Sequence, residues 1–518
     1  MRGPCDESVI RASQANAPCA DKSKTWILVA TILGSSMAFI DSTVVNVALP
    51  AIQTTFHANV VDVQWVVESY GLFLAALILV GGSLGDIFGR RLVFLLGVVV
   101  FTLASLSCGF ATSVRQLVFA RGVQGIGAAL LVPGSLAIIS SSFEEKDRGK
   151  AIGTWSGFTA ITAAVGPVLG GWLVEHASWR WAFFINIPIA AAVVAISLWR
   201  VPETRNTTSS RIDWLGSILV TLGLGGVVNG FIESVNLGWK HPVVLSSLVI
   251  GCVSLIAFVV AETRVASPIV PLGLFRSRTF SGANLLTLLL YAALGIFLFL
   301  FPLNLMQVQG YSPTKAGAAI LPMILLMFLL SRWSGGLVDR YGPRRPLIFG
   351  PIVAATGFAL FALPSISQNY WLTFFPAAVV LGLGMTVTVA PLTTVVMNSI
   401  KQSRAGAASG INNAVARVAG VLAIAVLGVV MVSVFAYRLN HNLAHIRLPT
   451  DVLQQLQLET TKLAGMQVPE AMDSSAKTTV HGAIQNAFVL GFRTVMLICS
   501  VLAMASAAVG GFMVQSDA

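Results

Sequence analysis

Ionisable side chains inside apolar stretches carry the clearest chemical signal in this sequence. Asp41, Glu68, Glu233 and Arg121 each lie within a long run of apolar residues. Such groups are costly inside a membrane and are functional by default. A carboxylic acid in a poorly hydrated cavity has a raised pKa, and a nearby arginine lowers it. These residues therefore predict the uptake of a proton or cation in one state and its release in another.

The three acids differ in how well they fit that role. Asp41 ranks first for coupling, although the alternative is that it holds its helix through hydrogen bonds to a neighbour. Glu68 ranks second. Glu233 ranks third, because it sits near the outer end of a helix that is not part of the two repeated sets described below.

The composition determines the solvent that most of the chain meets. The 518 residues are 56% hydrophobic and only 10% charged, with a mean hydropathy of +0.83, whereas soluble domains carry about 25% charged residues. Lipid must therefore surround most of the chain. The net charge of +11 fits Lys- and Arg-rich cytoplasmic loops better than a nucleic-acid surface. The five cysteines do not make a disulfide framework.

Runs of about 20 apolar residues predict membrane-spanning helices. The chain contains fourteen such runs, at 26–50, 62–84, 92–111, 116–139, 150–174, 180–199, 213–233, 243–261, 280–305, 314–338, 346–364, 371–397, 406–436 and 486–512. Lys and Arg gather on the side of the two termini, which predicts that both termini are cytoplasmic.

An internal repeat predicts the domain organisation. "GGSLGDIFGRR" at 81–91 is echoed by "SGGLVDRYGPRR" at 334–345, each copy after the second helix of a six-helix set. Repeated halves flanking a midplane site are a common transporter plan. The predicted parts are a cytoplasmic tail, a six-helix half, a linker with two extra helices, a second six-helix half and a short tail, at 1–25, 26–200, 201–278, 279–512 and 513–518.

The repeated segment concentrates turn-forming and charged residues. Its glycines permit tight turns, and its carboxylates can pair with bases or cap a neighbouring helix. The alternative is that the segment serves only as a topology anchor. The residues concerned are Gly82, Asp86, Gly89, Arg90 and Arg91 in the first copy, and Asp339, Arg340, Gly342 and Arg344 in the second.

The fifth run contains Gly166, Pro167, Gly170 and Gly171. Small residues let helices approach closely in lipid, and proline removes a backbone hydrogen bond and kinks the helix. A role in packing alone is the alternative to a role in transport.

Polar residues within the runs are candidates for the wall of a substrate cavity. Trp65 and Tyr70 have the alternative of an interfacial aromatic belt. The full set is Asn46, Gln64, Trp65, Tyr70, Asn284, Asn304 and Gln307.

A long polar segment at 437–485 lies on the outer side. Its composition predicts a surface helix near 451–465, with a solvated loop as the alternative reading of the whole segment. His441 and His445 have the i, i+4 spacing of metal ligands, but we predict no metal site, because the histidines all lie on the outer side and form no cluster with cysteines.

Four segments together resemble the signatures of the major facilitator superfamily, in its fourteen-helix drug:proton antiporter branch. They occur in family order and at family spacing: "IDSTVVNVALP" (40–50), "GGSLGDIFGRR" (81–91), "RGVQGIGAALLVPGSL" (121–136) and "GPVLGG" (166–171).

The resemblance implies an all-α membrane fold and proton-coupled export of small amphipathic or cationic compounds, such as drugs, by alternating access. It implies that Arg121 tunes proton transfer and that the fifth-helix motif closes a leak path. The Asp86 cluster would latch the cytoplasmic side in one state, with Arg148 as the preferred partner of Asp86. Ile87 stands where the family usually has a base, so the first latch is expected to be weaker than the second, which keeps Arg340.

The remaining expectations concern energy and partners. No GxxxxGK[ST] phosphate loop is present, so we expect a proton gradient as the energy source, no cofactor and no enzyme activity. We expect a functional monomer in the bacterial cell membrane. The rival functions are a transporter of one metabolite, siderophore or lipid, and a membrane receptor that moves nothing.

Overall fold

The computed structural model describes residues 21–205, 213–265, 268–366, 369–400, 405–444, 446, 448–468 and 472–515. The predicted tails at 1–25 and 513–518 fall largely outside these residues, and His445 falls outside them entirely.

The described chain is built from long apolar helices, because a helix satisfies its own backbone hydrogen bonds where no water can. Thirteen helices in these ranges are long and apolar enough to cross a membrane, and each corresponds to a predicted run. The fourteenth run, 346–364, forms the shorter helix Pro346–Phe361. The prediction of an all-α membrane protein is confirmed.

The helices of the first part of the chain follow the predicted order. They are α2 (Asp21–Phe56), α3 (Val60–Phe88), α4 (Arg90–Gly109), α5 (Val114–Ser142), α6 (Glu145–His176), α7 (Trp181–Phe184), α8 (Asn186–Arg200), α9 (Trp214–Leu237) and α10 (Pro242–Glu262).

Several runs of the second part are divided into shorter pieces. They are η1 (Leu272–Arg276), α11 (Arg278–Leu303), the π-helix η2 (Asn304–Val308), α12 (Pro313–Ala318), α13 (Leu321–Gly335), α14 (Leu337–Tyr341), α15 (Pro346–Phe361), α16 (Phe374–Asn398), α17 (Ala405–Leu443), α18 (Thr450–Leu458), η4 (Thr460–Gly465) and α19 (Ser474–Met513).

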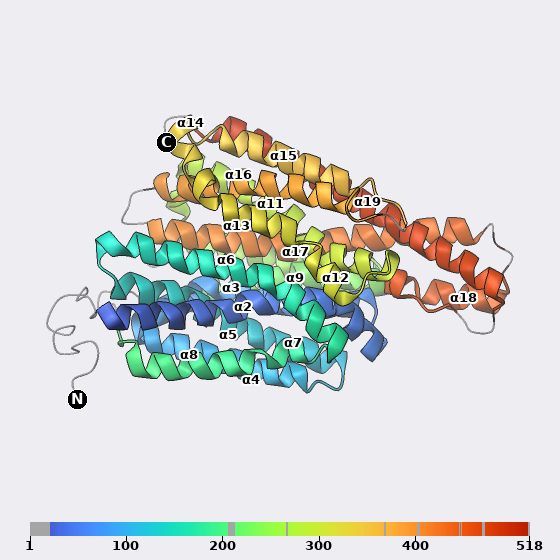
Figure 1. The fold of residues 1–518 in the computed structure, drawn as a ribbon, viewed down its shortest axis with the longest axis horizontal. Coiled ribbons are helices and arrows are strands. Elements are labelled where there is room, and N and C mark those ends of the chain that lie inside the picture. The colour runs from blue at the N-terminus through green and yellow to red at the C-terminus, as the bar shows by residue number, and fades with distance from the viewer. Residues whose placement is uncertain are drawn as a thin grey trace.

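Helices α2 to α8 lie together on one side of the molecule, and α11 to α19 lie together on the other (Figure 1). The two sets meet where α3 packs along α17 and where α6 contacts α12. Helices α9 and α10 form a closely packed pair, and α9 lies against both α3 and α17. The start of α2 and the end of α19 lie at the same end of the bundle.

The outer segment is more helical than its sequence predicted. α17 continues to Leu443 and α19 begins at Ser474, so both project beyond the bundle, with α18 between their tips (Figure 1). Glycine and proline are the residues least compatible with a helix interior, and 437–443 contains neither. The predicted surface helix near 451–465 forms as α18 followed by η4.

The contact between α6 and α12 is close at one end of α6 only. A Cβ atom added at Gly171 would lie 2.3 Å from the carbonyl oxygen of Pro313, and one at Gly317 would lie 2.0 Å from that of Pro167. Within the same motif, Gly166 and Gly170 lie against Thr43 and Val44 of α2. Towards the other end of α6, Gly157 has no neighbouring atom within 4 Å of its added Cβ. The two sets are therefore closed together at the α6–α12 contact, and α6 has free space beside it towards its other end, while α3 stays packed along α17.

This asymmetry makes the glycines of α6 unequal. We expect Gly171→Ala to destabilise the structure by about 1–3 kcal/mol, because the new methyl group overpacks a backbone contact. Gly157→Ala, on the same helix, should cost nothing measurable. Apparent unfolding temperatures of the purified variants test this, and equal temperatures for the two would contradict it.

Candidate functional site

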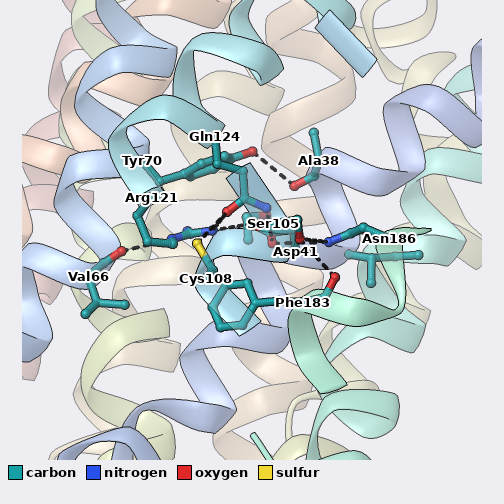
Figure 2. Close-up of polar contacts among 12 residues, drawn as sticks. Ala38, Asp41, Val66, Tyr70, Ser105, Cys108, Arg121, Gln124, Phe183 and Asn186 are labelled. Carbon is teal, nitrogen blue, oxygen red and sulfur yellow. Dashed lines mark hydrogen bonds and ion pairs between the residues drawn. The ribbon is translucent and has the colours of Figure 1, made fainter. Parts of the chain in front are cut away.

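A buried ion pair lies at the centre of the first helix set. The guanidinium of Arg121, on α5, donates to the carboxylate of Asp41, on α2 (Figure 2). The two side chains are 1% and 0% exposed. A pair removed from solvent to this degree stabilises the protein only if further hydrogen bonds satisfy both partners.

Amide side chains supply those further bonds. Gln124 Nε2 donates to Asp41 Oδ1 over 2.8 Å, and its Oε1 accepts from Arg121 over 2.8 Å. Asn186 Nδ2 lies 3.5 Å from Asp41 Oδ1 and donates to Ser105 Oγ over 3.0 Å. Both oxygens of the Asp41 carboxylate therefore accept hydrogen bonds, from residues of α5 and α8, and Ser105 of α4 holds Asn186.

Arg121 has partners on α3 as well. Its Nε donates to the carbonyl of Val66 over 3.0 Å, and its Cζ lies 4.3 Å from the ring centroid of Tyr70. The Tyr70 hydroxyl donates to the carbonyl of Ala38 over 3.3 Å (Figure 2). The network joins five helices of one half, so in this conformation Asp41 does what its structural alternative predicted. Its coupling role stays a prediction.

Glu68 is the opposite case. It is 0% exposed, and neither carboxylate oxygen has a hydrogen-bond partner in the described part of the chain. Gln64 Nε2 donates to the carbonyl of Ile424, on α17, over 3.2 Å, and a Cβ at Gly71 would lie 2.9 Å from Val421. Since residues 64, 68 and 71 share a helix face, Glu68 lies on the face of α3 that packs against the other half.

Glu233 is joined to Trp65. The indole Nε1 of Trp65, on α3, donates to Glu233 Oε1, on α9, over 2.9 Å. Both residues line a cleft at the surface between α3, α5 and α9. The structure thus brings two predicted site residues together, but away from the space between the halves.

The first copy of the repeated segment contains an ion pair different from the predicted one. Arg90 donates to Asp86 over 2.8 Å, whereas Arg148 is not in contact with Asp86 and its Nε has no partner among the described residues. The predicted Asp86–Arg148 pair is therefore absent in this conformation, because the turn at Gly89 between α3 and α4 brings Arg90 to the carboxylate.

A residue that sequence analysis missed completes this copy. Glu203 accepts from the backbone nitrogens of Arg91 and Leu92 over 3.1 and 3.0 Å. Gly89 has a φ of +118°, and a Cβ there would lie 2.6 Å from the Glu203 carboxylate. Only glycine fits that turn. Gly82 has more room, with its nearest neighbour, Pro133, 3.8 Å from an added Cβ.

The second copy of the repeated segment has fewer polar contacts than the first among the described residues. Gly342 has a φ of +76°, and Arg340 stacks on the ring of Tyr341 at 5.3 Å. Within the described residues, Asp339 and Arg344 have no ion-pair partner. The expectation that the first latch is weaker than the second concerns the state in which this end is closed, and it stays a prediction.

A cavity of about 500 Å³ lies between the two helix sets. Its wall comes from α2, α6, α11, α12, α13 and α16, with Asn46, Gly157, Phe301, Met323 and Met327 among the lining residues. None of its lining residues is charged. The oxygen Oδ1 of Asn46 is buried and has no hydrogen-bond partner in the described chain.

Asn46 is the only one of the seven predicted cavity residues that lines this space. The other six lie elsewhere, and their neighbours in the sequence did not distinguish a cavity position from a contact between helices. Gln64 lies in the α3–α17 interface, Tyr70 belongs to the Arg121 network, and Trp65 donates to Glu233. Asn284 accepts from Asn412, Asn304 is buried in η2, and Gln307 donates to Gln53 at the end of α2.

The segment 437–485 contacts the ends of both helix sets. Gln53 Nε2 donates to the carbonyl of Lys462 over 3.1 Å, and Gln307 Nε2 donates to Gln53 Oε1 over 2.8 Å. Leu463 is buried and has a φ of +53°, a strained conformation for leucine. Part of the predicted solvated loop is therefore packed against the ends of both helix sets.

Comparisons with known proteins agree with this architecture. The sequence matches the family described as "Major Facilitator Superfamily" over residues 31–424. The chain belongs to this superfamily. It is 36% identical over 417 residues to the multidrug resistance protein Stp of Mycobacterium tuberculosis, covering 79% of this chain and 76% of the relative.

Other members of the superfamily match over comparable lengths. The tetracenomycin C resistance and export protein of Streptomyces glaucescens is 31% identical, with 95% of this chain and 92% of the relative covered. The puromycin resistance protein pur8 of Streptomyces alboniger is 35% identical, with 84% and 88% covered.

A solved structure shows the same fold at low identity. A bacterial homolog of the human lysosomal transporter Spinster, in an inward-facing and unoccupied conformation, aligns with a TM-score of 0.64. It shares 17% identity, and the alignment covers 95% of this chain and 98% of that one.

The central network of this superfamily member contains residues without an obvious sequence signal. Gln124 follows Arg121 by three positions, which places both on one helix face, and that spacing was a usable signal. Ser105 and Asn186 are isolated polar residues in apolar runs. Only packing of α4 and α8 against α2 brings them to Asp41.

The buried pair predicts a specific pattern of stabilities. Asp41→Asn should destabilise by roughly 3–5 kcal/mol, because it leaves the Arg121 charge buried without its partner. Asp41→Asn combined with Arg121→Gln should recover much of that loss. Unfolding of the purified variants measures both.

The half-buried pair between Glu459 and Lys462, 2.7 Å apart, is the matched control. Glu459→Gln should cost about 0–1 kcal/mol. A double variant no more stable than Asp41→Asn alone would show that the network, rather than the unpaired charge, sets the cost.

Proposed function

We propose that this superfamily member is a proton-coupled exporter of small amphipathic compounds that works by alternating access. The observation that carries the proposal is the cavity between the halves, closed at the α6–α12 contact and lined by apolar and small polar side chains. Relatives named for multidrug, tetracenomycin C and puromycin resistance support it.

The cavity wall favours amphipathic rather than strictly cationic substrates. Asp41, Glu68 and Glu233 do not line it, so no carboxylate is placed to select a positive charge. Met323 and Met327 supply adaptable apolar surface. Asn46 supplies one unpaired acceptor, which suits a substrate that carries a hydrogen-bond donor.

The proposed orientation places the open end of the cavity in the cytoplasm. Lys and Arg concentrate in the loops at that end, which also holds both termini. A compound would enter from the cytoplasm or the inner leaflet and leave on the outside of a bacterial cell membrane, with the monomer as the working unit. The Asp86 and Asp339 clusters would latch the cytoplasmic end in the opposite state.

Glu68 is the better candidate than Asp41 for proton coupling. Asp41 is fully bonded within one half, whereas Glu68 is buried without a partner at the contact between halves. A buried, unpaired carboxylate is costly to keep ionised. A change in its proton occupancy would therefore alter the free energy of the α3–α17 contact, which is what coupling requires.

α17 offers a charge for the alternate state. Arg417 lies on the row formed by positions 417, 421, 424 and 428, and this row faces α3 through Val421 and Ile424. When the halves move, Arg417 is the cation placed to meet an ionised Glu68. Each proton that moves inward down 100 mV contributes about 2.3 kcal/mol.

Ethidium efflux tests the proposed function. Cells that express the protein should lose ethidium against its gradient, and a protonophore should stop this. Glu68→Gln should abolish active efflux while substrate binding to purified protein is retained. Gln64→Ala, one turn away on the same face, should reduce efflux far less.

Two results would count against the proposal. Efflux that continues with the protonophore would exclude proton coupling, and full activity of Glu68→Gln would remove Glu68 from the mechanism. Binding without flux in liposomes would instead indicate a receptor. Because several relatives are named for resistance to one antibiotic, the second candidate is export of a single compound, which a panel of substrates separates from multidrug export.

Asn46 gives a separate prediction about recognition. Asn46→Ala should weaken transport of substrates that carry an N–H or O–H donor by about fivefold, the effect of one lost hydrogen bond. Apolar substrates without a donor should be unaffected. Ser331→Ala is the control, because Ser331 lines the same cavity but already donates to Phe328. Equal losses for both substrate classes would contradict this role.

A further inference from the structure

The surface cleft between α3, α5 and α9 is a second space, apart from the cavity between the halves. Its volume is about 770 Å³, larger than the cavity between the halves. The cleft does not lie between the two helix sets. It opens on the surface that faces the bilayer, and Phe119 on its rim is 75% exposed.

One end of the cleft has charges of both signs. Asp62, near the start of α3, and Glu233, near the end of α9, contribute carboxylates, and Arg115, at the start of α5, contributes a guanidinium. One oxygen of Glu233 is held by the Trp65 indole, and one oxygen of Asp62 accepts from the backbone of Asn59. Among the described residues, none donates a hydrogen bond to the second oxygen of either carboxylate, which leaves it available to a ligand.

The rest of the cleft is apolar and has the depth of one leaflet. From Asp62 to Phe73, α3 rises by about 16 Å at 1.5 Å per residue, and half of the hydrocarbon core of a bilayer is about 15 Å. Phe73, Val118 and Ile126 line this stretch. A single acyl chain of a membrane lipid matches it in length and in polarity.

A polar group in the wall also lacks a partner. Ser69, one turn beyond Trp65, is 5% exposed, and its hydroxyl has no hydrogen-bond partner in the described chain. It lines the cleft between the charged end and the apolar stretch. The ester carbonyl of a glycerophospholipid lies at this depth below its headgroup and can accept from a hydroxyl.

We propose that this cleft binds a phospholipid whose headgroup carries both a phosphate and a primary ammonium, of the phosphatidylethanolamine class. The ammonium binds Glu233 and Asp62, the phosphate binds Arg115, the ester meets Ser69, and an acyl chain follows α3 and α5. A purely cationic amphiphile leaves Arg115 without an anionic partner, and an anionic lipid leaves the two carboxylates without a cationic one. The bound lipid joins α9 to the first helix set.

Native mass spectrometry of the purified full-length protein tests this without reference to transport. The protein is mixed with equal amounts of phosphatidylethanolamine, phosphatidylcholine and phosphatidylglycerol that carry identical acyl chains. We expect retention of phosphatidylethanolamine over the other two by about fivefold, since phosphatidylcholine lacks ammonium N–H donors and phosphatidylglycerol lacks the cation.

Variants locate the effect in the cleft. Glu233→Gln and Arg115→Gln should each remove the preference, and Ser69→Ala should lower retention of all three lipids. Lys240→Gln and Asp473→Asn, which change charge at the same end of the molecule outside the cleft, are the controls and should keep the preference. Elution as a single species confirms that each variant is folded.

Two results would overturn the proposal. One is equal retention of the three lipids by the wild type, or an unchanged preference in both Glu233→Gln and Arg115→Gln. The other is binding of tetraphenylphosphonium that Arg115→Gln strengthens, together with no preference among lipids, which would assign the cleft to a cationic compound.

Discussion

An apolar solvent surrounds most of this chain, and it penalises every polar group that lacks a partner. That constraint divides the intramembrane polar residues into two kinds. Asp41, Arg121 and Gln124 satisfy one another almost completely, and so act as a fixed joint for the helices of one half. Glu68, Asn46 and Ser69 are left unsatisfied, each at a different kind of boundary.

We propose a different function at each of the three boundaries. Glu68 lies where the two halves meet, where a change of charge can alter their contact. Asn46 lies on the cavity wall, where a substrate can supply the missing donor. Ser69 lies in the cleft facing the bilayer, where a lipid can do so. A rigid half, a movable contact and two ligand surfaces thus follow from one rule about buried polar groups.

Close backbone contacts between helices are the second feature on which the structure depends. Association of helices in lipid depends on packing rather than on the hydrophobic effect. The glycines of α6 and α12 allow these two helices to pack closely at one end of α6. Towards its other end, α6 has free space around Gly157. A transporter needs contacts of this kind that form and separate as units, because a packed interface has discrete states.

Local patterns in the sequence were enough to predict the lipid surroundings, the helices and the resemblance to the superfamily. These patterns are long apolar runs, the repeated GGSLGDIFGRR-type segment and four motifs in order. They can be recognised without knowing which helices pack together. The sequence also identified Asp41, Glu68 and Arg121 as costly intramembrane charges.

Tertiary structure alone decided which of these charges is paired. Whether an acid is satisfied depends on residues more than a hundred positions away, such as Asn186 beside Asp41. The same holds for Gln64, Tyr70 and Gln307, whose side chains face helix contacts rather than the cavity. A helical pattern gives the face of a residue but not the neighbour that packs there, because that neighbour is chosen by the three-dimensional arrangement of all the helices.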